Sequence, residues 1–310
     1  MEAISRKHRT AAASGGAVTE ARDPGTQASG IVNAMSVDVE DYFHVSAFED
    51  HIPREDWDHL PCRVEGNTDR ILELFDRNDV KATFFVLGWV AERFPHLVRR
   101  ITSAGHELAS HGYSHVRAGN QTRGEFQQDV VRAKNILEEI AGSSVGGYRA
   151  PSYSIGAKNL WAVDILQEVG YRYSSSIYPI HHDLYGMPEA PRFAFRHEGC
   201  GLLEIPISTV RLFKLNLPCG GGGYFRLLPY KVSRWAINQL NEREKQACIF
   251  YFHPWEIDPQ QPRQQKARLK SRVRHYLNLE RMEARLEFLL KDFTWDRIDK
   301  VFLTDLESRP

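Results

Sequence analysis

Residues 31–44 run Ile-Val-Asn-Ala-Met-Ser-Val-Asp-Val-Glu-Asp-Tyr-Phe-His. An apolar run with the length of a buried strand ends here in three carboxylates within four residues, Asp38, Glu40 and Asp41. Packing does not account for so much negative charge at the end of a strand, although acidic clusters are also common in solvated turns and helix N-caps. The stretch therefore predicts a site for a positive group, provided that the rest of the chain supplies partners.

Three further polar motifs also stand directly after apolar stretches. They are His-Gly-Tyr-Ser-His at 111–115, Arg-Ala-Pro-Ser-Tyr at 149–153 and Tyr-Phe-His-Pro-Trp at 251–255. Short apolar strands alternate with helical segments about seven times, which is typical of a parallel sheet with helices outside. We predict an α/β fold, and favour a closed or nearly closed (β/α) barrel over an open doubly wound sheet because no glycine fingerprint marks a dinucleotide site. In either fold the motifs belong at the carboxyl ends of the strands.

Composition excludes several classes of protein. The 310-residue chain has 40 basic and 40 acidic residues, so no global positive field would attract nucleic acid. No apolar run approaches the ~18 residues of a membrane-spanning helix, and we expect no span. The four cysteines are widely spaced and form no zinc-binding pair, so we expect free thiols. The glycine run at 220–223 lacks the Lys-Ser/Thr of a phosphate loop, so we expect a mobile substrate loop and no nucleotide.

The ends of the chain differ from its middle. Residues 1–30 contain almost no large apolar side chains, which predicts a disordered tail. Their basic residues are not followed by the apolar segment of a secretory signal, so we expect the protein in the cytoplasm. Near the other end of the chain, the sequence pattern of residues 265–290 predicts one long basic helix.

His111 and His115 are the strongest candidates for metal ligands. They lie four positions apart, which places both rings on one face of a helical turn, although two histidines at this spacing also occur by chance on a surface. Two histidines with one carboxylate from another strand end form the set that binds a divalent ion with open positions for water and substrate. We therefore predict a divalent metal ion as cofactor, with zinc as the first choice.

Such a site would hydrolyse an amide or an ester. A bound ion lowers the pKa of its water from 15.7 to roughly 7 and polarises a carbonyl oxygen. A base and an acid must then move the protons, and Asp38 and His253 can divide these roles. Arg149 can hold Asp38 ionised. Taken alone, Arg149 also fits an ordinary salt bridge, and His253 fits a core histidine.

The order of these motifs resembles the NodB-homology polysaccharide deacetylases, which form carbohydrate esterase family four. The resemblance covers roughly residues 31–258 and rests on five segments: Asp38-Val39-Glu40-Asp41, Ser110 to His115, Arg149 to Tyr153, Tyr173 to Ser176, and Phe252-His253. It implies a distorted or incomplete (β/α) barrel of about seven parallel strands. It also implies metal-dependent removal of N-acetyl groups from hexosamine units of an oligo- or polysaccharide.

Three further sequence motifs narrow the resemblance to one branch of this family. Val-Asp-Val-Glu-Asp-Tyr-Phe, Gly-Gly-Gly-Tyr-Phe-Arg and Phe-His-Pro-Trp-Glu are similar to the branch associated with exosortase-A exopolysaccharide gene clusters. By that resemblance, residues 31–258 form the deacetylase barrel and residues 259–310 a helical extension packed on it. The branch also implies a role in exopolysaccharide biosynthesis.

The chain departs from the common family pattern in two places. Many members have adjacent aspartates, the first as base and the second as ligand, whereas Val39 follows Asp38 here. A continuing strand would place Asp38 and Glu40 on one face, so we favour Glu40 as the third ligand, with Asp41 as the alternative. In addition, the fourth segment has serines where an aspartate often orients the catalytic histidine, and Asp183 is a candidate substitute.

Five residues are expected to contact the substrate. Pro151 and Tyr153 belong to the third segment, while Tyr224 and Trp255 offer aromatic faces to sugar rings, as does Phe225. Two other functions fit the same residues. One is hydrolysis of small cyclic or linear amides on the same barrel, and the other is glycan binding without catalysis.

Overall fold

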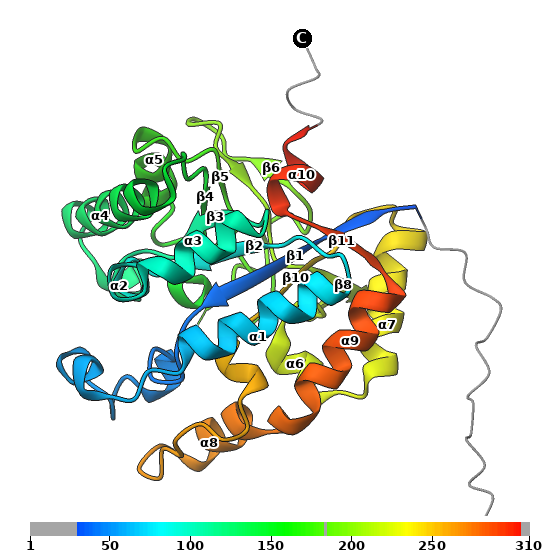
Figure 1. Ribbon diagram of the computed structural model, residues 1–310. Helices are drawn as coiled ribbons and strands as arrows, with labels where there is room; N and C mark the ends of the chain where they lie inside the picture. Colours follow the sequence, from blue (N-terminus) through cyan, green and yellow to red (C-terminus); the bar gives the residue numbers. More distant parts are fainter. Residues whose placement is uncertain (1–29, 183–184, 305–310) are drawn as a thin grey trace, which may run out of the picture.

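The computed structural model describes residues 30–182 and 185–304 (Figure 1). Its main sheet has the strand order β10-β1-β2-β3-β4-β5-β7-β6, and β11 also pairs with β1. The neighbours from β10 to β7 are seven parallel strands, and β6 is antiparallel at the edge. The strands are β1 Val32–Val39, β2 Thr83–Val86, β3 Glu107–Ser110, β4 Gly147–Tyr148, β5 Tyr173–Ser174, β6 Phe195–Arg196, β7 Leu203–Glu204, β10 Ile249–Phe252 and β11 Thr294–Asp296. This confirms the distorted (β/α) barrel.

Helices connect the strands along the outside of the sheet, and Figure 1 shows β1, in blue, crossing the centre among them. Their bounds are α1 Val64–Arg77, α2 Gly88–Arg93, α3 Pro95–Ser103, α4 Arg123–Ala141, α5 Trp161–Glu168, α6 Gly222–Leu227, α7 Tyr230–Asn238, α8 Leu269–Tyr276, α9 Met282–Asp292 and α10 Ile298–Phe302. Local signals set the ends of the longest helix, α4. Thr122 and Glu125 form its capping box, and Gly142 ends it with a left-handed φ of 66°.

The register of the strands places the predicted site. Val37 of β1 pairs with Phe252 of β10, so the residues that follow them, Asp38 and His253, leave the sheet at one level. Ser110 of β3 pairs with Tyr148 of β4, which does the same for His111 and Arg149. The carboxyl ends of four parallel strands therefore bring the four motifs together, as the strand-end rule predicts.

The glycine run packs against the barrel, so the prediction of a mobile loop is wrong. It follows the hairpin of β8 Thr209–Leu212 and β9 Leu215–Pro218. The carbonyl of Gly220 accepts a hydrogen bond from the Tyr251 amide at 2.7 Å, alongside β10. A Cβ on Gly220 would lie 2.3 Å from the carbonyl oxygen of Ile249, so only glycine permits this approach.

The predicted helix over 265–290 is also wrong as a single element. The chain forms α8 and α9 instead, separated at Asn278, whose left-handed φ of 53° interrupts the helix. Beyond α9, β11 returns to pair in parallel with β1. The predicted tail falls almost wholly on residues 1–29, outside the described residues. Within the described residues, no helix is both long and apolar enough to cross a membrane.

Candidate active site

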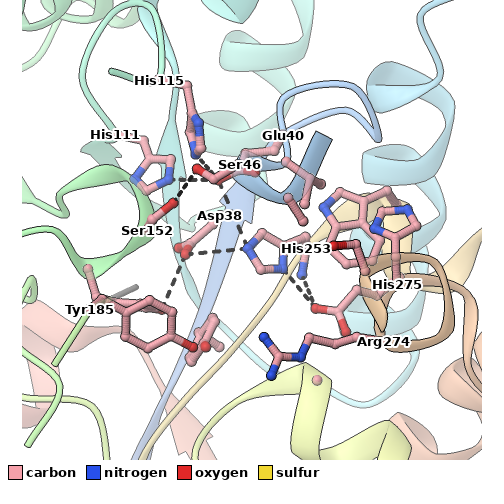
Figure 2. A pocket seen from close by; sticks show the side chains of 18 of the residues that line it. Asp38, Glu40, Ser46, His111, His115, Ser152, Tyr185, His253, Arg274 and His275 are labelled. Carbon is pink, nitrogen blue, oxygen red and sulfur yellow. Dashed lines mark hydrogen bonds and ion pairs between the residues drawn. The ribbon is translucent and has the colours of Figure 1, made fainter. Parts of the chain in front are cut away.

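Three side chains converge on one point at the carboxyl end of the sheet. The Nε2 atoms of His111 and His115 lie 2.8 and 3.0 Å from Oε1 of Glu40 (Figure 2). One possible ligand atom from each residue lies within 4.8 Å of the others, and all three residues are buried. Two imidazole nitrogens and a carboxylate oxygen are the donor set expected for zinc and related ions, so these residues fit a divalent metal.

Backbone contacts present these donors to one another. Nδ1 of His111 lies 2.8 Å from the Arg149 carbonyl, which can only accept, so this nitrogen donates and the lone pair of Nε2 in the neutral ring is free to bind a cation beside Glu40. His115 has a left-handed φ of 54°, an uncommon conformation for a residue with a side chain. Burial would raise the pKa of Glu40, but His115, His253 and His111 hold it well below its usual range. The carboxylate therefore stays ionised.

Asp41 does not face the histidines, which corrects its place among the candidate ligands. Its carboxylate accepts hydrogen bonds from the backbone amides of Tyr42, Arg63 and Val64 at 2.9, 2.5 and 2.8 Å. Arg63 and Val64 stand at the start of α1, where free amides favour a negative charge. Asp41 thus anchors a helix, and Glu40 is the carboxylate that meets the two histidines.

Asp38 lies beside this cluster and is fixed by Arg149. Nη1 of Arg149 donates to Oδ1 of Asp38 at 2.6 Å, and both side chains are almost completely buried. The same guanidinium donates to the hydroxyls of Ser36 and Ser175 at 2.9 and 3.1 Å. The Tyr153 hydroxyl lies 3.4 Å from Oδ2 of Asp38. These contacts leave the carboxylate little freedom to rotate.

His253 reaches the site from the other side. Its Nε2 atom lies 4.0 Å from both Oδ2 of Asp38 and Oε1 of Glu40. Burial lowers the pKa of His253, but the carboxylates of Glu40, Glu256 and Asp38 outweigh burial and raise it to about 9. A cation bound to Glu40 would offset part of that effect.

Glu256 orients His253, and the sequence reasoning missed it. Its Oε1 atom lies 2.8 Å from Nδ1 of His253 and accepts the backbone amide of the same residue at 3.1 Å. The spacing from 253 to 256 is that of a capping box, a signal that could have identified it. Asp183, the predicted substitute, lies outside the described residues. The serines of the fourth segment serve elsewhere, since Ser176 accepts the Ala150 amide at 2.9 Å.

Two neighbours hold Glu256 in place. Nε of Arg226 donates to its Oε2 atom at 2.7 Å, and Nη1 of the same guanidinium donates to the carbonyls of His275 and Leu277 at 2.9 and 2.7 Å. A Cβ on Gly222 would lie 2.4 Å from Oε1 of Glu256. The glycine run therefore makes room for this carboxylate.

The predicted substrate residues divide into two groups. Tyr153 and Trp255 line the pocket that contains Asp38, Glu40 and His253. The Trp255 ring stacks on His253 at 5.1 Å between ring centroids, and on His275 at 4.1 Å on its other side.

The other predicted contacts are not among the lining residues of this pocket. Pro151 is buried, and Phe225 packs in the core against Phe250. Tyr224 is half-buried on the same short helix, α6. These three predictions are therefore corrected.

Two family models match adjacent parts of this chain and leave β1 outside both matches. The polysaccharide deacetylase model matches residues 55–174, and a domain of unknown function, DUF3473, matches residues 175–303. A peptidoglycan-N-acetylglucosamine deacetylase of Bacillus cereus is 36% identical over 98 residues, which are 31% of this chain and 36% of that protein. A chitooligosaccharide deacetylase of Sinorhizobium fredii is 33% identical over 100 residues, 32% of this chain and 44% of that protein. The matches thus span less than half the length of these relatives.

Solved structures share the fold. A presumed polysaccharide deacetylase from Mycobacterium smegmatis has a TM-score of 0.55 at 20% identity, covering 89% of this chain and 91% of that one. The Puue allantoinase has a TM-score of 0.58 at 16% identity, covering 93% of both chains. The fold alone therefore does not separate a glycan substrate from a small amide.

Proposed function

We propose that this chain is a metal-dependent hydrolase that removes N-acetyl groups from hexosamine units of an oligo- or polysaccharide, because residues 55–174 match the polysaccharide deacetylase model and residues 175–303 match DUF3473. One observation carries the proposal. The three-residue donor cluster lies in one pocket with a buried carboxylate, Asp38, and an oriented imidazole, His253.

Glu40, His111 and His115 would hold the metal, and zinc is the ion that we propose. When bound, the ion would make a water molecule acidic and polarise the acetyl carbonyl. The buried cluster itself keeps the three donors facing one point before any ion arrives. This arrangement limits the reorganisation needed on binding.

Asp38 is the base in this proposal. Its carboxylate accepts the proton of the attacking water, since it lies beside the donor cluster and is ion-paired with Arg149. Arg149 acts through Asp38, because its ion pair fixes the orientation of the carboxylate in the pocket.

His253 is the acid. Its Nδ1 atom is engaged by Glu256, so Nε2 faces the pocket and can donate a proton to the leaving amine nitrogen. Trp255 stacks against the imidazole and keeps water from that side. Glu256 is a positioning residue, because it acts on the reaction through His253.

The test is acetate release from N-acetylated oligosaccharides by the purified protein with a divalent ion restored. We expect release that is abolished by chelation and by Asp38→Asn, while Asp38→Asn still binds metal and Glu40→Ala does not. A panel of small cyclic and linear amides, assayed in parallel, should give little turnover. Absence of acetate from every N-acetylated glycan with metal bound would overturn the proposal.

The biological setting is proposed on the sequence resemblance. DUF3473 belongs to the exosortase-associated branch, which supports a role in exopolysaccharide biosynthesis. Location in the cytoplasm stays a prediction from the N-terminal sequence. Deletion of the gene followed by analysis of acetylation in the exported polysaccharide would test the role.

A further inference from the structure

Residues 259–279 form a segment of the chain that is rich in basic residues. The whole chain balances 40 basic against 40 acidic residues, but this segment contains no Asp or Glu. We call its six cationic residues the basic rim: Arg263, Lys266, Arg268, Lys270, Arg272 and Arg274. A cluster of positive charges creates a local positive electrostatic potential, even in a protein whose net charge is zero. Neighbouring acidic residues normally offset such a potential.

The basic rim reaches the candidate active site through Arg274. Ser271, Arg274 and His275 line the same pocket as Asp38 and His253. Figure 2 shows Arg274 and His275 on the side of His253 that faces away from the metal-binding cluster. A polymer chain that enters the pocket therefore meets Arg274 and approaches the segment that carries the rest of the rim.

The arginines of the basic rim are largely without acidic partners. Within residues 30–182 and 185–304, no carboxylate forms an ion pair with Arg263, Arg268, Arg272 or Arg274. The same holds for Lys266 within those ranges. Three of these arginines, Arg263, Arg268 and Arg274, are exposed to solvent. Cations that repel one another around a pocket are stabilised when an anionic ligand arrives.

We infer that the substrate is an anionic glycan, with a carboxylate or phosphate group on a unit beyond the N-acetylated sugar. The inference rests on the proposed function. The rim supplies both guanidinium and ammonium groups, and guanidinium groups suit carboxylate and phosphate oxygens alike. An anionic membrane fits less well, because the exposed apolar residues of α8 are only Leu269 and Val273, whereas Arg274 faces into the pocket.

The experiment compares three N-acetylated oligosaccharides of equal length: one neutral, one bearing a uronic acid and one bearing a phosphate. Acetate release gives kcat/KM for each at 50 mM and at 1 M salt. We expect the anionic oligomers to exceed the neutral one by about tenfold at 50 mM salt, because complementary charge speeds association. The preference should nearly vanish at 1 M salt, where the Debye length falls to about 3 Å. The two anionic arms show whether carboxylate or phosphate is the better group.

A charge-neutralised variant tests the residues themselves. Its substitutions are Arg268→Gln, Arg272→Gln and Arg274→Gln. We expect the ratio of anionic to neutral kcat/KM to fall toward one. The matched control removes three exposed cations that lie outside both the basic rim and the pocket lining, Arg77→Gln, Lys158→Gln and Arg243→Gln, and should keep the ratio.

The failures of the two proposals are distinguishable. Acetate release without preference for anionic oligomers overturns the substrate inference and leaves the proposed function standing. No acetate from any substrate overturns both. A rim variant that loses binding to phosphatidylglycerol vesicles, while the wild type shows no glycan preference, also overturns the inference and assigns the rim to a membrane surface.

Discussion

Replacement of Glu256 by glutamine is the sharpest test of how His253 is held. The carboxylate serves three donors: the His253 amide and ring nitrogen at Oε1, and Arg226 at Oε2. Glutamine has nearly the same shape, but one of its two terminal atoms donates. In either orientation its NH2 group faces a donor, so at least one of the three contacts is lost.

The magnitude follows from the type of contact that is lost. A hydrogen bond to a charged group is worth about 1.5–3 kcal/mol, which corresponds to a fall in kcat of about ten- to 150-fold. Arg226 also loses its buried counter-charge, and breaking such a pair costs about 3 kcal/mol of folding free energy. The KM should change little, because His253 acts on the leaving group.

The assay measures kcat and KM for acetate release alongside the free energy of unfolding. Glu244→Gln is the matched control, since Glu244 also binds an arginine, Arg192, at 2.6 and 3.0 Å, but does not line the pocket. The control should lose some stability and keep its kcat. If Glu256→Gln retains kcat within twofold of the wild type while folded, Glu256 does not position the acid.

Three other changes have defined outcomes. Gly222→Ala should lower kcat with the fold retained, because the new Cβ would lie 2.4 Å from Oε1 of Glu256. Gly66→Ala in α1 is the control: its Cβ would meet nothing within 4 Å, so this variant should keep its activity in the same acetate assay. Arg149→Met should lower the free energy of unfolding by about 3–5 kcal/mol in urea titrations, because Asp38 stays buried without its partner; an unchanged free energy of unfolding would contradict that reasoning. Burial and Asp299 raise the pKa of Glu107 to about 7, above its unfolded value, so its contribution to stability is present at low pH and is lost as pH rises through 7. Glu107→Gln should therefore gain stability relative to the wild type between pH 5 and 8, and a difference that stays flat with pH would refute this assignment.

The sequence predicted the site best where strand geometry alone decides. Parallel strands end at one edge, so Asp38, His111, Arg149 and His253 could be placed together from their positions after apolar runs. The period of two along β1 also favoured Glu40 correctly over its neighbour as the carboxylate that meets the histidines.

The features that were missed depend on packing between distant segments. The glycine run was expected to be mobile because glycine is flexible, but its small size is used to approach β10 and Glu256. Asn278 has no sequence signal strong enough to end a helix within a basic, periodic stretch, and yet its left-handed backbone does so. An aromatic residue such as Tyr224 could not be placed inside or outside the pocket without knowing which way α6 turns.

The hydrogen bonds of the Arg226 guanidinium limit how far this protein could be shortened from its C-terminal end. A gene cut after codon 258 would still encode every residue that we expect to touch the reacting atoms. It would, however, remove the carbonyls of His275 and Leu277, and a buried arginine would be left with two hydrogen-bond acceptors fewer. The segment after residue 258 is therefore part of the structure that holds Arg226, Glu256 and His253 in place. Engineers who shorten or exchange it would alter the acid as well as the surface.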